Sequence, residues 1–148
     1  MIRKTFLYRA KSSRYLAPSL VLLLTACGGG ELDYAELEGT VWELTELTVM
    51  GGYDFSPDVP GDYTLRFESE NRLRGNSDCN TFTGQWSAEQ GFAVTEFDHT
   101  RTMCLSGSIH NFYVLYLPDV VNLTMEDELL VASTTTEGVR LAFQPAPQ

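Results

Sequence analysis

The feature that most constrains the fold is a set of short segments in which large apolar and polar residues alternate. Tyr63, Leu65 and Phe67 alternate with polar neighbours, and the same period of two recurs in residues 81–86, 121–125 and 139–143. This period places one face of each segment in a core and the other in water, as in a half-buried antiparallel sheet. The sequence therefore predicts a sheet protein rather than a helical bundle.

Turn-forming residues separate these segments: Glu70-Asn71, Gln90-Gly91, Asp127-Glu128 and Glu137-Gly138. In an earlier segment, Trp42 and Leu44 share one face while Leu47 and Val49 share the other, which predicts a bulge near Thr45 or Glu46. Residues 50–61 hold three glycines and two prolines and are expected to form a loop. We expect a strongly curved, barrel-like sheet of about seven or eight strands.

One segment has helical spacing. Leu105, Ile109, Phe112 and Tyr116 are four, three and four residues apart, which places them on one face of a helix over residues 105–117. Ser106 or Ser108 is expected to cap its start and Pro118 to end it. The predicted class is α+β, with the helix packed on the apolar side of the sheet rather than lining a ligand pocket. We expect the following side chains to be mostly buried: Trp42, Phe67, Phe82, Trp86, Phe112, Leu123 and Phe143.

The first 26 residues have the composition of a secretory leader. Basic residues lie between positions 3 and 14, an apolar run covers 16–24, and Leu24-Thr25-Ala26-Cys27 follows. This pattern resembles the lipobox of bacterial lipoproteins, whose cysteine is lipidated after cleavage of the leader. The alternatives are an ordinary secretory signal with a chance cysteine and a short membrane anchor, although the run is too short to span a bilayer. We expect a signal peptide (1–26), a lipidated tether (27–36), a folded domain (37–144) and a tail (145–148).

The charge balance changes once the leader is removed. From Cys27 onward the chain has five arginines, no lysine and all 20 acidic residues, so its net charge is 5 − 20 = −15, against −10 for the whole chain. This balance argues against nucleic acid as a partner and against electrostatic docking on anionic lipid. The predicted membrane contact is therefore the lipid alone. Because Gly28 rather than an aspartate follows Cys27, we expect the outer membrane, with the domain facing the periplasm.

Two short motifs stand out, and the first contains Gly75, Cys79, Asn80, Phe82 and Gly84. It resembles the G-x-x-x-C-N-x-[FY]-x-G segment of the META/HslJ family.

The second motif covers Thr100-Arg101-Thr102-Met103-Cys104, which resembles the family's T-[KR]-M-x-C segment. Met103 lies one position beyond the usual methionine. An opening strand matched by Gly39, Trp42 and Leu44 adds to the resemblance. It implies a small extracytoplasmic α+β domain, often a lipoprotein, that is linked to envelope stress and antibiotic tolerance. It implies no catalytic residue and no cofactor, and Arg101 is expected to pair with a surface carboxylate.

The chemistry of the motifs lies in two cysteines. Cys79 and Cys104 are the ones left after Cys27 is lipidated, and an oxidising compartment favours a disulfide between them. The alternatives are free thiols, a zinc site shared with His99 and His110, and a nucleophilic triad of Cys79 with His99 and Asp98. We expect the disulfide, and neither a metal nor a cofactor.

Three classes of function follow. The expected one is a non-enzymatic envelope lipoprotein that binds or stabilises a protein partner and is related to stress or antibiotic tolerance. The second is a small-ligand carrier with a cavity between sheet and helix. The third is an enzyme, for which only the Cys79–His99 pairing argues.

Overall fold

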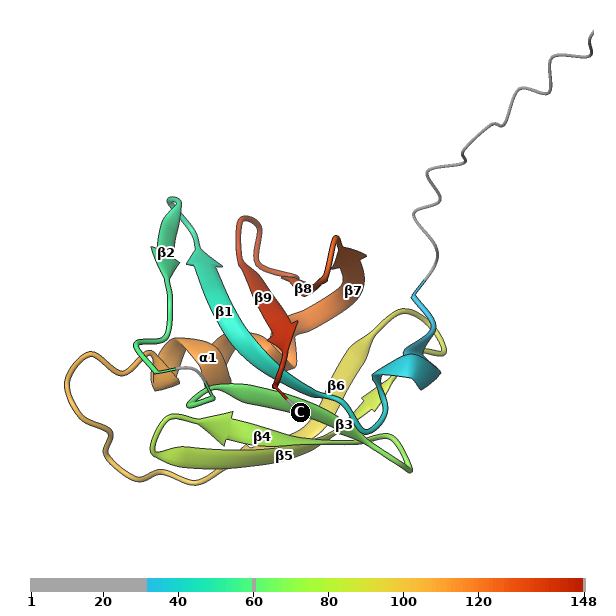
Figure 1. Cartoon of the computed structure of the whole chain (residues 1–148), viewed down its shortest axis with the longest axis horizontal. Coiled ribbons are helices and arrows are strands. Elements are labelled where there is room, and N and C mark those ends of the chain that lie inside the picture. Colours follow the sequence, from blue (N-terminus) through green and yellow to red (C-terminus); the bar gives the residue numbers. More distant parts are fainter. Residues whose placement is uncertain (1–31, 60, 148) are drawn as a thin grey trace, which may run out of the picture.

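The computed structural model describes residues 32–59 and 61–147, so the predicted leader and Cys27 lie outside the described residues. Nine strands form one antiparallel sheet in which eight follow the order β6-β5-β4-β3-β1-β9-β8-β7, and β2 pairs with β1 (Figure 1). The strands are β1 (Val41–Val49), β2 (Tyr53–Phe55), β3 (Thr64–Glu68), β4 (Arg72–Ser77), β5 (Asn80–Ser87), β6 (Ala93–His99), β7 (Val120–Glu126), β8 (Leu129–Thr134) and β9 (Arg140–Pro145).

The described helices are one α-helix, α1 (His110–Tyr116), and two 3-10 helices, η1 (Tyr34–Leu37) and η2 (Leu117–Asp119). None of these helices is long and apolar enough to cross a bilayer. The predicted α+β class and the strongly curled antiparallel sheet with one α-helix are confirmed. The strand β2 lies in the segment that was expected to be only a loop, so that expectation was incomplete.

The predicted bulge in the first strand is present. The β1–β9 register shifts between Leu44 and Glu46, and the Thr45 hydroxyl donates to the Ala142 carbonyl at 3.0 Å. The extra residue turns the second half of β1 so that Leu44 and Leu47 both point into the core. One strand can therefore pair with three others and follow the curl of the sheet.

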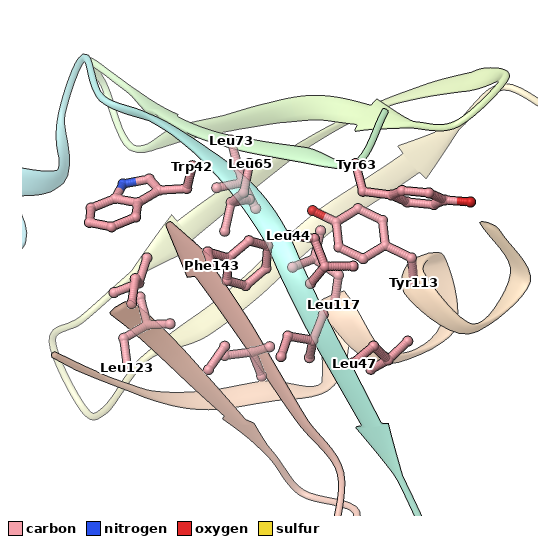
Figure 2. Packing of buried hydrophobic residues seen from close by; sticks show 14 of the residues in the cluster. Trp42, Leu44, Leu47, Tyr63, Leu65, Leu73, Tyr113, Leu117, Leu123 and Phe143 are labelled. Carbon is pink, nitrogen blue, oxygen red and sulfur yellow. The ribbon is translucent and has the colours of Figure 1, made fainter. Parts of the chain in front are cut away.

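Aromatic side chains fill the space between the sheet and α1. Tyr113 reaches from α1 into the core beside Tyr63 and Phe143 (Figure 2). Its ring centroid lies 5.5 Å from that of Tyr63, 5.8 Å from that of Phe82 and 6.3 Å from that of Phe143. Its hydroxyl donates to the Thr64 carbonyl at 3.0 Å, so its one polar group is paired. The helix thus closes the open side of the curled sheet, and the core cluster lies within residues 37–143.

The predicted helix was wrong in length and phase. It begins at His110 rather than Leu105, and its buried residues are His110 and Tyr113, with Leu117 following in η2. Leu105 is 88% exposed and Phe112, which was expected to be buried, is 40% exposed and stacks on Phe55. The physical reason is that residues 100–104 are held in an extended path by contacts described below. Pro118 lies two residues beyond Tyr116, where α1 ends, and the Ser108 hydroxyl accepts the His110 N–H at 3.2 Å.

The other members of the expected core are buried: Trp42, Phe67, Phe82, Trp86, Leu123 and Phe143. In β7, however, the alternation predicted the wrong neighbours for Leu123. Val121 and Met125 are 43% and 42% exposed, while Val120 is buried. A register shift between Val120 and Asn122 brings Val120 rather than Val121 to the core side, and Met125 lies next to the last residue of the strand.

Glycine is required at one motif position because two strands approach closely there. A β-carbon on Gly75 would overlap the carbonyl of Thr64 on β3 and the ring of Phe82 on β5. Gly75 lies directly opposite Phe82 in the β4–β5 ladder. The glycine therefore lets the aromatic ring of the next strand lie against the β4 backbone.

Candidate functional site

The site is built at the end of the β4–β5 hairpin. Ser77 and Asn80 form the last pair of the ladder, and Asp78 and Cys79 make the connection. Asp78 has a φ of 58°, a conformation that Asp tolerates better than most residues, and its N–H donates to the Asp62 carbonyl at 2.7 Å. The hairpin thus places Cys79 and Asn80 at a tightly fixed point.

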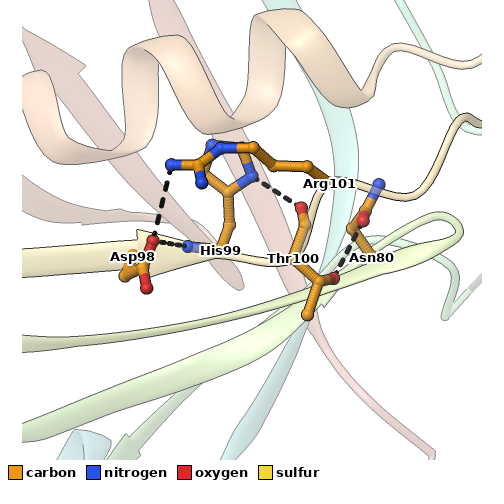
Figure 3. A network of polar contacts seen from close by, with 5 residues as sticks. All are labelled: Asn80, Asp98, His99, Thr100 and Arg101. Carbon is orange, nitrogen blue, oxygen red and sulfur yellow. Dashed lines mark hydrogen bonds and ion pairs between the residues drawn. The ribbon is translucent and has the colours of Figure 1, made fainter.

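The side chain of Asn80 holds a distant segment through both of its polar atoms. Its Oδ1 accepts the N–H of Thr102 at 2.7 Å and the hydroxyl of Thr100 at 2.8 Å, and its Nδ2 donates to the Thr102 carbonyl at 2.9 Å. Figure 3 shows the Asn80–Thr100 contact. The amide is 2% exposed, so these bonds replace its contacts with water. The backbone that the Asn80 side chain binds is 22 residues further along the chain.

The predicted disulfide between Cys79 and Cys104 is confirmed. Their Cα atoms are 5.4 Å apart, and the Asn80 Nδ2 lies 3.3 Å from each sulfur. Because both sulfurs are in the disulfide, neither can bind zinc as a thiolate. Cys79 also has no free thiol to act as a nucleophile. Within the described ranges, no group of three or more His, Cys, Asp or Glu side chains is arranged to hold a metal ion.

Two histidines lie next to this bond but form no catalytic triad with it. The His99 Nδ1–H donates a hydrogen bond to the Thr100 carbonyl at 2.8 Å. The Asp98 carboxylate accepts the backbone N–H of His99 at 2.9 Å and does not bond to the His99 ring (Figure 3). Asp98 also pairs with Arg101 at 3.7 Å, and both side chains are exposed. Arg101 thus meets a surface carboxylate, as predicted.

His110 is the buried member of the histidine pair. Its Nδ1 lies 2.6 Å from the hydroxyl of Ser77, which is fully buried, and its ring meets that of His99 at 5.3 Å and 71°. Burial lowers the pKa of His110 below 6.5, and the neighbouring His99 lowers it further. The ring is therefore neutral at pH 7, and the pair fastens the start of α1 to the end of β4.

The segment that these contacts hold in place, residues 100–108, is called the disulfide loop below. It presents Met103 and Leu105 to solvent, at 94% and 88% exposure. Beside it lies a pocket of about 390 Å³ bordered by His99, Arg101 and His110. A fixed loop with exposed apolar side chains can bind another surface. The polar side chain beside it, Asn80, is hydrogen-bonded to the loop itself.

Comparison with known proteins agrees with the two motifs. The META domain family matches residues 35–148. The chain belongs to the META domain family. The META domain found here also resembles an NMR structure of a protein from Burkholderia xenovorans, with a TM-score of 0.64 and 18% identity, over 96% of this chain and 100% of that one.

A crystal structure of a DUF4847 family protein from Bacteroides vulgatus is a more distant neighbour, with a TM-score of 0.55 and 12% identity, over 77% of this chain and 97% of that one. At these identities the likeness shows the fold alone. No curated protein matches the chain.

The META motif residues have mainly structural roles here. Gly75, Asn80 and Thr100 shape the hairpin and the loop, Phe82 is core, and the backbone of Thr95 on β6 lies close to Gly84. Met103 and Arg101 are the exposed long side chains of the two motifs. Sequence reasoning missed the Ser77–His110 contact, because two polar residues 33 positions apart carry no local signal of their pairing.

We predict that removing the disulfide destabilises the META domain by about 2–4 kcal/mol, because the unfolded chain regains the freedom of a loop of 25 residues. Chemical denaturation of Cys79→Ala/Cys104→Ala should show this loss. Wild type in a reducing agent should behave alike, and the double variant should be insensitive to that agent. An unchanged denaturation midpoint would contradict the prediction.

We also predict that His110 makes stability depend on pH. Because folding lowers its pKa, the unfolded chain takes up a proton first as the pH falls below about 6.5. The free energy of unfolding should therefore be greatest above that pH and decline as the pH falls toward the pKa of the folded state. The difference between wild type and His110→Gln, measured from about pH 8 to pH 5, isolates this term. His99→Gln keeps the buried ring and should keep most of the decline.

Proposed function

We propose that this chain is a non-enzymatic, lipid-anchored protein of the bacterial envelope whose META domain binds a protein partner through the disulfide loop. One observation carries the proposal: Asn80 and the disulfide fix a loop that exposes Met103 and Leu105 almost completely. Large apolar side chains held in water by a rigid backbone are typical of recognition surfaces.

The rigidity of the loop favours binding. A flexible loop loses conformational entropy when it is ordered by a partner, whereas a loop already held at Asn80, Cys79 and Cys104 loses little. Burying two large apolar side chains then contributes about 1.5–3 kcal/mol each. The loop is therefore suited to be the centre of an interface, with Arg101 at its rim.

The anchor and the compartment are part of the proposal. The Leu-Thr-Ala-Cys27 sequence after an apolar run supports lipidation, and Gly28 supports sorting to the outer membrane with the domain in the periplasm. The Cys79–Cys104 disulfide suits an oxidising compartment. The family resemblance supports a role in envelope stress or antibiotic tolerance.

The small-ligand carrier is less well supported. It needs a cavity between sheet and helix, and the ring of Tyr113 occupies that space in contact with Tyr63, Phe82 and Phe143. No observation on the described residues favours it over partner binding.

Lipid anchoring predicts the outcome of a fractionation experiment. Wild type should take up labelled palmitate and sediment with the outer membrane. A Cys27→Ala chain, exported by an unrelated cleavable signal in place of residues 1–26, should be unlabelled and soluble. A fully membrane-bound Cys27→Ala chain would refute lipid anchoring. Wild type in the inner membrane would refute only the sorting step.

Partner binding predicts a loss specific to the disulfide loop. Met103→Ser/Leu105→Ser should reduce recovery of the partner from the protein's own envelope at least tenfold, because the apolar centre of the interface is removed. Val121→Ser/Met125→Ser, on exposed residues of β7, is the matched control and should recover the partner normally. Both variants replace exposed side chains, so their melting temperatures should stay close to wild type. Equal recovery with both would refute the loop as the binding surface.

A further inference from the structure

A second surface of the molecule departs from its acidic composition. The outer face of β3, β4 and β5 bears a pocket of about 430 Å³ whose border includes Arg66, Arg74, Asn76, Thr81, Thr83 and Val41. None of its bordering residues is acidic. The chain after Cys27 has four acidic residues for each arginine, so an acid-free pocket with two guanidinium groups is a local exception.

The strand register places the two arginines together. Arg66 on β3 lies directly opposite Arg74 on β4, and Arg74 lies directly opposite Thr83 on β5. Like charges directly opposite in an antiparallel ladder disfavour the fold. The arrangement therefore costs stability, and a bound anion would reverse that cost.

Carboxylates of the protein relieve this repulsion only in part. Among the described residues, Arg66 forms no ion pair, and Arg74 has a single one, to Glu68 at 3.6 Å on the surface. By contrast, Arg140 on β9 lies 3.0 Å from the carboxylate of Glu126. The pocket thus keeps cationic groups available while acidic side chains are abundant elsewhere.

We propose that this pocket binds a phosphate group. A guanidinium offers its N–H groups as a planar fork, and a tetrahedral phosphate can accept from two such forks at once. A phosphate ester also carries about −1.5 to −2 charge at pH 7 and three acceptor oxygens, against a single charge and two oxygens for a carboxylate, so two opposed arginines favour phosphate. The Thr81 and Thr83 hydroxyls and the Asn76 amide border the same pocket and can donate to the remaining oxygens or to neighbouring hydroxyls of the ligand.

The phosphate can belong to a free phosphate ester or to a phospholipid headgroup. Both present the same oxygens, and a titration distinguishes them. The protein is the unlipidated chain from Gly28 onward, which contains the whole described core. The probes are inorganic phosphate, glycerol 3-phosphate, and vesicles of phosphatidylglycerol with vesicles of phosphatidylcholine for comparison. Isothermal titration and amide shifts report binding of the soluble probes, and co-sedimentation reports binding to vesicles.

We expect saturable binding to at least one phosphate probe that weakens with added salt, since exposed charges are screened. Arg66→Gln/Arg74→Gln should weaken it at least tenfold. Arg140→Gln removes a positive charge from β9, outside the pocket, and should leave binding within about twofold. Saturable binding to soluble esters assigns a free ligand, and binding to phosphatidylglycerol vesicles alone assigns a headgroup.

Three results would overturn the proposal: no saturable binding to any probe, equal binding by the Arg66→Gln/Arg74→Gln variant, or an equal loss in the control. Near-ultraviolet circular dichroism verifies that the variants are folded. If the double variant fails to fold, Arg66→Lys replaces it. This change keeps the charge but removes the fork, so it should weaken binding measurably, and unchanged affinity would count against the proposal.

Discussion

The side-chain amide of Asn80 is the interaction on which the functional end of the molecule depends. It meets the backbone of Thr102 with a donor and an acceptor at once, as a neighbouring strand would. Aspartate lacks the donor, leucine lacks both groups, and glutamine is one methylene too long for the same fit. These bonds are partly buried, so removing the amide would cost about 1–3 kcal/mol for each backbone group left unpaired. The Cys79–Cys104 bond then fastens the same two segments covalently.

These contacts decide where α1 can begin. With residues 100–104 bonded to the hairpin, the chain reaches its helical path only after Gly107, whose φ of 95° turns it toward the sheet. The Ser77–His110 contact then fixes the first turn of α1 to β4, and Tyr113 enters the core one turn later. The disulfide loop, the β4–β5 hairpin and the start of α1 are therefore held together by direct contacts. The exposed Met103 and Leu105 lie on its outer edge because the backbone is not free to fold them inward.

The sequence predicted what depends on local patterns. Period-two alternation identified β3, β5 and β9, and the facing of Trp42, Leu44, Leu47 and Val49 predicted the bulge in β1. Compartment and cysteine count predicted the disulfide, and the two motifs predicted the META family. What failed depends on contacts that are distant along the chain. Helical spacing from Leu105 carries no information that Asn80 holds the preceding residues, and the alternation in β7 does not show the shift at Val120. The Ser77–His110 pair has no sequence signal at all.

The charge of the chain shows a similar limit. The net charge of −15 after Cys27 determines the electrostatic interaction of the whole molecule with a long polyanion. It therefore argues against nucleic acid as a partner. A single phosphate instead responds to charges within a screening length of about 8 Å at physiological salt. Strand register determines the field at that distance: a turn centred on Glu70 pairs Arg66 with Arg74, so both guanidinium groups leave the sheet on the same face. An acidic protein can therefore carry a cationic pocket. The position of the turn at Glu70 determines the β3–β4 register, and this register places the two arginines opposite each other.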